Sequence, residues 1–304
     1  MNRDAAPIAT ILIVTKNRVD DLRQAVASAT AQTGAIDVLI IDDGSTDGTS
    51  RMIASEFPGV TLVTHAQSQG LVVRRNQGVT ASRSKVVISI DDDAVLTDPD
   101  IATRTVTAFG DAHIGAIAMP YANVKRSPQL HQLAPDDQDI YVTDTFIGTA
   151  HAVRRDVFVQ LGGYREGLFH QGEEADYCIR MLAAGYTVRL GFGSAIHHFE
   201  SPRRDFTRMD HYGPRNAILF VWQNVPAAAA LRQGPLTIGG VLMHTLNPRR
   251  LVTRIGGVID GLVSCLREER APVSADAFAL WRRLRHASPP LRLDDIAPEL
   301  SGRG

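Results

Sequence analysis

Cysteine is scarce in this chain of 304 residues, which contains only Cys178 and Cys265. The two lie far apart and fit neither a disulfide framework nor a metal-ligand spacing, so we interpret both as structural and expect a reducing compartment. Long apolar runs are also lacking, since no stretch of about 20 uncharged apolar residues is available to span a bilayer. The opening residues "MNRDAAPIAT" have no apolar core of a secretory signal. These absences predict a cytoplasmic protein, either free or peripheral on the cytoplasmic membrane face.

The chain also lacks an excess of positive charge. Its formal net charge is −1 and its pI is near 6.8, which predicts no nucleic-acid partner for the chain as a whole. The charge is unevenly distributed, however. Residues 1–200 carry 17 Lys and Arg against 24 Asp and Glu, whereas residues 201–304 carry 15 against 9. We expect metal binding in the acidic part, and an anionic partner or a membrane surface for the basic part.

Apolar runs alternate with helical patterns over the first hundred residues. This alternation predicts an α/β fold whose mostly parallel sheet is covered by helices on both faces. The expected strands are 8–15, 36–42, 60–65 and 85–91, and the expected helices are 21–32, 47–57 and 71–83. Further along we expect a helix over 100–110, a strand over 114–121, a long polar loop over 122–140, a helix over 172–186 and a strand over 187–200.

The residues beyond 205 are predicted to be mainly helical, with helical segments at 209–223, 249–266 and 277–285, ending in a loosely ordered Pro-rich tail. The segment 247–263 is amphipathic and flanked by arginines. It predicts either contact with a membrane surface or an anionic lipid-linked acceptor, or ordinary packing together with self-association as a homo-oligomer.

Polar side chains follow the predicted parallel strands at their carboxyl ends, where ligands bind in open α/β sheets. The run Asp91-Asp92-Asp93 is the most acidic of these positions. Three adjacent carboxylates repel one another unless a cation neutralises them, and carboxylate oxygens suit Mg²⁺ or Mn²⁺. The run therefore predicts a metal site, the alternative being a solvated acidic turn.

Two further acidic groups have competing interpretations. Asp42 and Asp43 precede a helix start and are not needed for capping, so either could accept hydrogen bonds from a base or a ribose. Glu173, Glu174 and Asp176 share the first turn of a helix, where the macrodipole favours acids, but one of them could act as a general base. His197 and His198 follow a strand, and either imidazole could ligate the same metal.

Six motifs in this order resemble the family 2 glycosyltransferases, which are nucleotide-sugar enzymes of the GT-A fold. They are "TKNR" (15–18), "IDDGSTDGT" (41–49), "RRNQG" (74–78), "IDDDAV" (90–95), "LGGYREGLFHQGEEADYCIR" (161–180) and "IHHFE" (196–200). The resemblance implies an inverting transfer from a nucleoside diphosphate sugar, UDP-, GDP- or dTDP-linked, with Mn²⁺ or Mg²⁺ at a DxD-type motif. It also implies a glycan, a lipid-linked molecule or a small molecule as acceptor.

By position, the resemblance assigns a role to each motif residue. Glu174 falls at the catalytic-base position, with Glu173 and Asp176 as rivals, and Asp93 is implied as a metal ligand together with Asp91 and one of His197 and His198. The implied nucleotide-sugar contacts are Thr15, Asn17, Arg18, Asp42, Asp43, Arg75, Asn76, Asp91 and Asp92.

The same resemblance predicts a catalytic domain over 1–204. Its nucleotide-sugar half spans about 8–100, and its acceptor and catalytic-base half spans about 101–204, ahead of the helical region 205–304. Two rivals stay open at this point: a metal-dependent nucleotidyltransferase, and a non-catalytic relative that binds sugar nucleotides or glycans.

Overall fold

The computed structural model describes residues 6–200 and 205–302. Its first half confirms the predicted alternation of strands and helices, to within a few residues at each end. The elements are β1 (Ala9–Thr15), α1 (Val19–Thr30), β2 (Ile36–Asp42), α2 (Thr49–Glu56), β3 (Thr61–Thr64), α3 (Leu71–Ala81) and β4 (Val86–Asp91). Strands β1, β2, β3 and β4 pair in parallel, so their carboxyl ends share one edge.

The main sheet has nine strands in the order β13-β9-β11-β6-β10-β4-β1-β2-β3. Seven of the nine run in one direction, and β9 and β10 run against them. The sheet is therefore mostly parallel, as predicted. Between residues 101 and 190, the helices and the strands of the main sheet are α4 (Ile101–Thr107), β6 (Ile114–Ala118), β9 (Tyr141–Thr143), β10 (Ala150–Arg154), α5 (Arg155–Gln160), α6 (Glu173–Ala183) and β11 (Thr187–Leu190).

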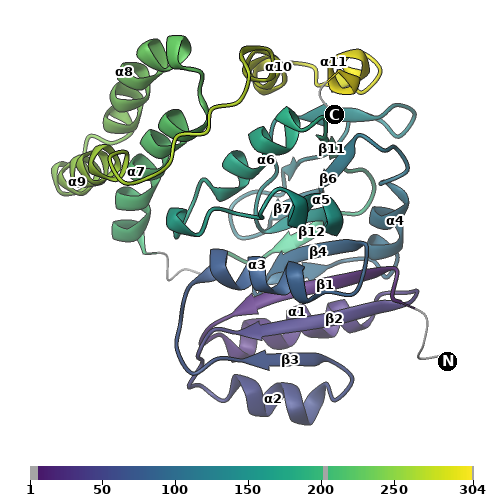
Figure 1. The fold of residues 1–304 in the computed structure, drawn as a ribbon. Coiled ribbons are helices and arrows are strands. Elements are labelled where there is room, and N and C mark those ends of the chain that lie inside the picture. The colour runs from purple at the N-terminus through teal and green to yellow at the C-terminus, as the bar shows by residue number, and fades with distance from the viewer. Residues whose placement is uncertain (1–5, 201–204, 303–304) are drawn as a thin grey trace.

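The sheet is buried on both faces because its side chains alternate between two apolar clusters. Along β1, Ile11 and Ile13 join the cluster that includes residues of α1 and α4. Leu12 and Val14 join the cluster that includes residues of α3, α5 and α6. Figure 1 shows the helices arranged around the central strands, with β3 and α2 at one margin. A strand covered on both faces has to be apolar throughout, which explains the unbroken runs in the sequence.

A second, four-stranded sheet departs from the sequence prediction. It consists of β5 (Ala94–Leu96), β12 (Ile196–His198), β7 (Tyr121–Asn123) and β8 (Leu130–His131). The strand expected over 187–200 is two strands, β11 and β12, which belong to different sheets. Strand β8 lies wholly, and β7 partly, in the segment 122–140 that was expected to be a loop. Strands of two or three residues have too few positions to show a period.

The C-terminal region is mainly helical, as predicted, and contains one long helix that the sequence prediction missed. Its elements are α7 (Phe206–Asn224), α8 (Ala227–Met243), α9 (Pro248–Ser264), α10 (Ala275–His286), β13 (Leu291–Arg292) and α11 (Ala297–Ser301). Helix α8 was missed because it contains Pro235 and three glycines and buries none of its residues, so it has no clear apolar period.

The expectation of a loosely ordered tail is wrong. Strand β13 pairs with β9 at the edge of the main sheet, and Leu293, Ile296 and Leu300 are buried in the core. These three side chains, together with the pairing of β13, hold the tail on the core. The predicted boundary at residue 204 lies outside the described residues, and the division into domains stays a prediction. Within the described ranges, no helix combines the length and apolarity needed to cross a membrane.

Candidate active site

An open pocket lies at the carboxyl edge of the parallel strands. Strand β4 supplies Asp91, α3 supplies Arg75, the first turn of α6 supplies Glu173 and Glu174, and β12 supplies His198. The topology brings these side chains together from positions more than a hundred residues apart. Other residues that line the pocket are Leu71, Tyr121, Asn123, Arg126, Ser127, Gln129, His131, Ile147, Gly148, Thr149, His170, Gln171 and Glu200.

The three consecutive aspartates are held by two arginines, and Asp92 and Asp93 share one of them. Asp91 accepts a hydrogen bond of 2.7 Å from Arg75. Asp92 accepts bonds of 2.8 Å from Thr15 and 2.7 Å from Arg18. Asp93 accepts a bond of 2.8 Å from the same Arg18 nitrogen. Two arginines therefore balance much of the negative charge of the run.

Burial affects the three aspartates unequally. It raises the pKa of Asp92 to about 7, with the adjacent charge of Asp93 adding to the rise and Arg18 opposing it. Burial alone would also raise the pKa of Asp93. There, the hydrogen bond from His198 and the charges of His198 and Arg18 outweigh burial and lower the pKa below its ordinary value. Asp93 is thus held as a carboxylate.

Asp91, Asp93 and His198 form the candidate metal centre. One ligand atom from each lies within 4.8 Å of the others, and His198 Nε2 is 3.1 Å from Asp93 Oδ1. Two carboxylates and an imidazole suit Mn²⁺ or Mg²⁺. The structure also distinguishes the two histidines. Alternation along β12 buries His198 toward the site and leaves His197 exposed on the other side.

Glu173 and Glu174 lie close to the buried guanidinium of Arg75. Arg75 Nη1 lies 3.7 Å from Glu173 and 4.0 Å from Glu174, and its other nitrogen donates to Gly148 O at 2.8 Å. A side chain at position 148 would displace the ends of Glu174 and Arg75, because an added Cβ there would overlap both. Burial and the neighbouring Glu173 raise the pKa of Glu174 to about 8, and Arg75 only partly offsets them.

Asp176 is on a different side of helix α6 and does not line the pocket. It is fully buried and forms ion pairs with Arg165 and Arg180, and it accepts a bond of 2.8 Å from Asn224. These contacts join α6 to the loop before it and to α7. The structure therefore does not bring this rival of Glu174 to the site.

Asp42 and Asp43 are fully engaged with their own chain. Asp42 accepts bonds from the Ser45 backbone and the Ser50 hydroxyl. Asp43 accepts four hydrogen bonds from the segment 68–74: the Ser68 hydroxyl, the Gln69 and Gly70 amides, and Arg74. Burial acts to raise the pKa of Asp43, but these bonds lower it to about 2. A role in reading a base stays a prediction for both.

Asn17 and Asn76 also bind the chain itself. Asn17 adopts a left-handed backbone (φ 54°) and accepts a bond of 2.7 Å from the Thr46 amide. Asn76 exchanges two bonds with the backbone of Tyr164, at 2.8 and 2.9 Å. These asparagines hold the loops that border the site, and their contact with a nucleotide stays a prediction.

Sequence reasoning missed two groups at the site. Glu200 is buried, accepts a bond of 2.9 Å from Asn123 and pairs with Arg126. Its position two residues after His198 could have indicated it, because alternate residues of an extended chain face the same way. His151 is buried behind the pocket, where it bonds to Gly148 O and Tyr164 and stacks on Phe146. Nothing in the local sequence indicated this role.

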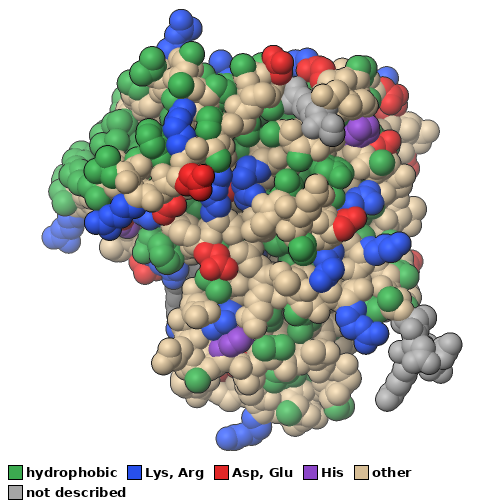
Figure 2. All heavy atoms as spheres, in the orientation of Figure 1, with side chains coloured by type: hydrophobic (Ala, Val, Ile, Leu, Met, Phe, Trp, Pro, Cys, Tyr) green, Lys and Arg blue, Asp and Glu red, His purple; other side chains and the backbone are tan. Residues whose placement is uncertain are grey.

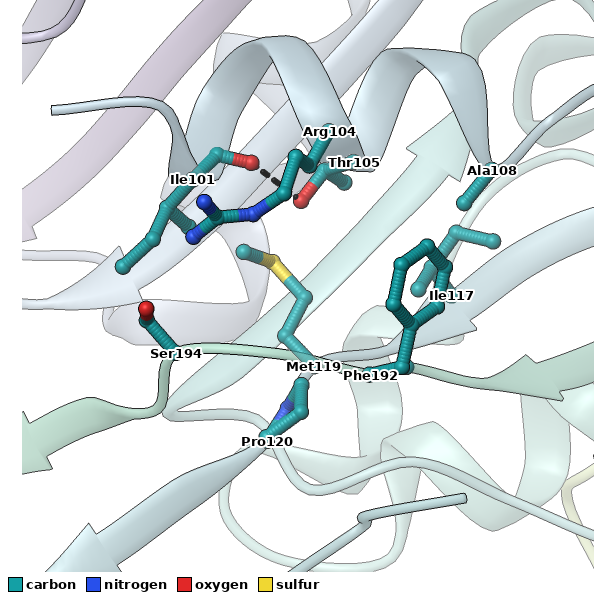
Figure 3. Close-up of a pocket in the computed structure, with 10 residues that line it drawn as sticks. Ile101, Arg104, Thr105, Ala108, Ile117, Met119, Pro120, Phe192 and Ser194 are labelled. Carbon is teal, nitrogen blue, oxygen red and sulfur yellow. Dashed lines mark hydrogen bonds between the residues drawn. The ribbon is translucent and has the colours of Figure 1, made fainter. Parts of the chain in front are cut away.

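A second cavity shows by contrast what the site requires. It lies beside α4 and is lined by Ile101, Met119 and Phe192 together with Arg104 and Ser194 (Figure 3). None of the residues that line it is an acid or a histidine. Unlike the pocket at the sheet edge, this cavity therefore offers no carboxylate or imidazole to a metal ion.

Comparison with known proteins assigns the chain to a family. Residues 10–162 match the family model described as Glycosyl transferase family 2. This match spans half of the chain, and the chain belongs to that family.

Curated relatives have low sequence identity to this chain over the aligned residues. A pre-mycofactocin glycosyltransferase of Mycobacterium tuberculosis (strain CDC 1551 / Oshkosh) is 24% identical over 256 residues, covering 77% of this chain and 52% of the relative. The succinoglycan biosynthesis protein ExoU of Rhizobium meliloti is 33% identical over 93 residues, 29% of this chain and 27% of the relative. The chain thus spans about half the length, or less, of these relatives.

Solved structures share the fold. A mannosyltransferase from Pyrobaculum calidifontis, in complex with GDP-Man and Mn²⁺, has a TM-score of 0.58 at 20% identity and covers 92% of this chain and 79% of that one. TarS 1–349 of S. aureus in complex with UDP has a TM-score of 0.62 at 13% identity, with coverage of 97% and 86%. These likenesses establish the GT-A fold.

Proposed function

We propose that this chain transfers a sugar from a nucleoside diphosphate sugar to an acceptor hydroxyl, with inversion at the anomeric carbon. The observation that carries the proposal is the pairing of two acidic centres in one pocket. The candidate metal centre Asp91, Asp93 and His198 lies on one side, and Glu174, whose pKa is raised to about 8, lies on the other.

The donor end of the pocket suits a diphosphate. Asp91, Asp93 and His198 would hold Mn²⁺ or Mg²⁺, which would supply positive charge to the departing diphosphate. Arg75 is buried and already aimed at Asp91, so its guanidinium can offset negative charge that develops in the same place without reorganising. The experiment below compares UDP-, GDP- and dTDP-linked donors.

Glu174 is the proposed general base. It is one of the two pocket carboxylates on α6. With a pKa of about 8 it is a stronger base than an ordinary glutamate once it is ionised, and because it is largely protonated below that pH, turnover should rise as the pH approaches 8. It would take the proton of the acceptor hydroxyl as that oxygen attacks from the face opposite the diphosphate. A single base with this geometry gives inversion, with no need for a carboxylate nucleophile.

The first experiment screens UDP-, GDP- and dTDP-sugars with Mn²⁺ for thermal stabilisation and for release of the nucleoside diphosphate. We expect at least one donor to raise the melting temperature and to be turned over. Glu174→Gln should retain the stabilisation and lose the turnover. Glu269→Gln, which changes an exposed glutamate outside the pocket, is the matched control and should keep both.

Three results would count against the proposal. If no donor shifts the melting temperature and Asp93→Ala leaves the Mn²⁺ affinity unchanged, the pocket does not bind nucleotide sugars. If donors bind without turnover and Glu174→Gln changes nothing, the chain is a non-catalytic binding relative. If a nucleoside triphosphate and a sugar phosphate yield pyrophosphate, the chain is a nucleotidyltransferase.

A further inference from the structure

Helix α9 carries a line of large apolar side chains that faces solvent. Val252, Ile255, Ile259 and Leu262 follow one another at intervals of three or four residues, which places them on one side of the helix, and Leu266 continues the line. Their exposed fractions range from 41% at Ile255 to 87% at Leu266. A helix of a globular protein ordinarily turns such a face toward the core. We call these five residues the α9 stripe.

The opposite side of α9 is fixed against α7, so the stripe cannot rotate inward. An added Cβ on Gly257 would lie 2.1 Å from His211 O, and one on Gly261 would lie 2.9 Å from Arg215 O. The two backbones are therefore in close contact at these glycines. Arg254 is also buried on this side and donates to Asp210 at 2.8 Å. The exposure of the stripe follows from this packing.

The exposed apolar surface continues onto α8. Leu231, Leu236 and Met243 are 70–80% exposed, and Leu246, in the turn before α9, is 97% exposed. More than half of the exposed large hydrophobic side chains in the described ranges lie between residues 231 and 266. Figure 2 shows hydrophobic side chains gathered on the side of the molecule where Figure 1 places α8 and α9. Monomeric soluble proteins rarely expose a contiguous apolar surface of this kind.

Positive charge surrounds this surface. Between residues 226 and 267 the only acid is Asp260, which is occupied by Arg215 and His211 at 3.1 Å each. Arg232, Arg249 and Arg267 are exposed in the same segment. Apolar side chains edged by arginines match the boundary between the acyl chains and the headgroups of an anionic bilayer. A second copy of this chain is a poorer match, because a two-fold contact through the same surface would bring like charges together.

We propose that α8 and α9 dock this protein on an anionic lipid bilayer, with the α9 stripe lying in the plane of the membrane interface. The inference goes beyond the proposed function and does not depend on it. The stripe enters the acyl boundary, and the exposed arginines contact the phosphates of the lipid headgroups.

Vesicle flotation of the full chain tests the proposal. The protein is mixed with vesicles of phosphatidylcholine alone, or of phosphatidylcholine and phosphatidylglycerol in equal parts, at low and high salt. We expect flotation with the anionic vesicles and weaker flotation in high salt. The triple variant Val252→Ser, Ile259→Ser, Leu262→Ser should lower the bound-to-free ratio by about tenfold or more, because it removes apolar contact with the acyl boundary.

The matched control changes three exposed apolar residues elsewhere, Ile8→Ser, Leu133→Ser and Val159→Ser, and should float like the unmodified chain. Circular dichroism and melting temperature check that both triple variants fold. The proposal is overturned if the unmodified chain stays unbound, if it binds neutral vesicles equally well, or if the stripe variant still floats. It is also overturned if light scattering shows a dimer that the stripe variant alone dissociates while the unmodified chain does not float.

Discussion

Two sets of acidic residues lie along the same edge of the sheet and behave in opposite ways. Asp42 and Asp43, after β2, are saturated by hydrogen bonds from their own chain, and the pKa of Asp43 is lowered to about 2. Glu173 and Glu174, at the start of α6, share one arginine, and the pKa of Glu174 is raised to about 8. A position at the same edge of the sheet therefore does not decide whether the pKa of a carboxyl is lowered or raised.

What separates them is the number of donors around each carboxylate. Asp43 receives two amides, a hydroxyl and a guanidinium, which together compensate its burial. Glu173 has a buried oxygen, Oε2, with no hydrogen-bond partner among residues 6–200 and 205–302, and it stands beside a second acid. A carboxylate that its surroundings leave undercompensated can take up a proton near neutral pH.

The largest effect expected from this contrast is on catalysis. Glu174→Gln should lower kcat by about 10²–10⁴-fold because it removes the proton acceptor, while the donor still stabilises the protein. Asp43→Asn removes no carboxylate from the lining of the pocket, so at saturating donor its kcat per folded molecule should stay near that of the unmodified chain. Turnover measured beside the melting curve distinguishes the two. Full activity in Glu174→Gln would show that the two sets of carboxylates do not differ in their effect on catalysis.

The next effect is on metal binding. Asp93→Asn removes a charged ligand from the candidate centre and should weaken Mn²⁺ binding by about 10–100-fold, judged by calorimetry. Asp42→Asn, at the saturated position on the same sheet edge, is the control and should leave Mn²⁺ affinity near that of the unmodified chain. Equal affinity in the Asp93 variant would mean that the ion binds elsewhere.

The third effect is on stability, and here the larger loss is expected for the Asp43 variant and not for the Glu174 variant. Asp43→Asn breaks a buried ion pair with Arg74, whose side chain and that of Asp43 are each 5% exposed. We expect a loss of about 3 kcal/mol in the free energy of unfolding, measured by urea titration. Glu174→Gln should not be destabilising at pH 8. If both variants unfold at the same urea concentration, the two carboxylates are energetically alike.

The fourth effect is a dependence of stability on pH. The pKa of Glu174 rises on folding from 4.5 to about 8, so the folded state binds more protons than the unfolded state between these values. The contribution of Glu174 to stability is therefore present below about pH 4.5 and is lost as the pH rises toward 8. Melting temperatures of the metal-free protein should fall over this window, and the fall should be shallower in Glu174→Gln. Parallel curves for the two proteins would contradict the raised pKa.

The sequence predicted the parallel half of the fold well, because unbroken apolar strands and amphipathic helices are local signals. It predicted the mainly helical character of the C-terminal region but missed α8, whose residues are held by neighbouring helices without any becoming fully buried. It also predicted an unstructured tail where Ile296 and Leu300 are in fact buried. The tail was missed because its anchoring contacts are with distant parts of the chain, whereas α8 was missed because it packs against its sequence neighbours α7 and α9 without a clear apolar period.

By itself, the sequence determined which residue types gather at the edge of the sheet, because the end of each parallel strand must fall there. Tertiary structure alone decided how each one is used. The three aspartates diverge to Arg75, Arg18 and His198, and Asp176 turns away from Glu174 to join α7. Partners at such separations in sequence cannot be inferred from local patterns, yet they set the charge and the proton affinity of every carboxylate at the site.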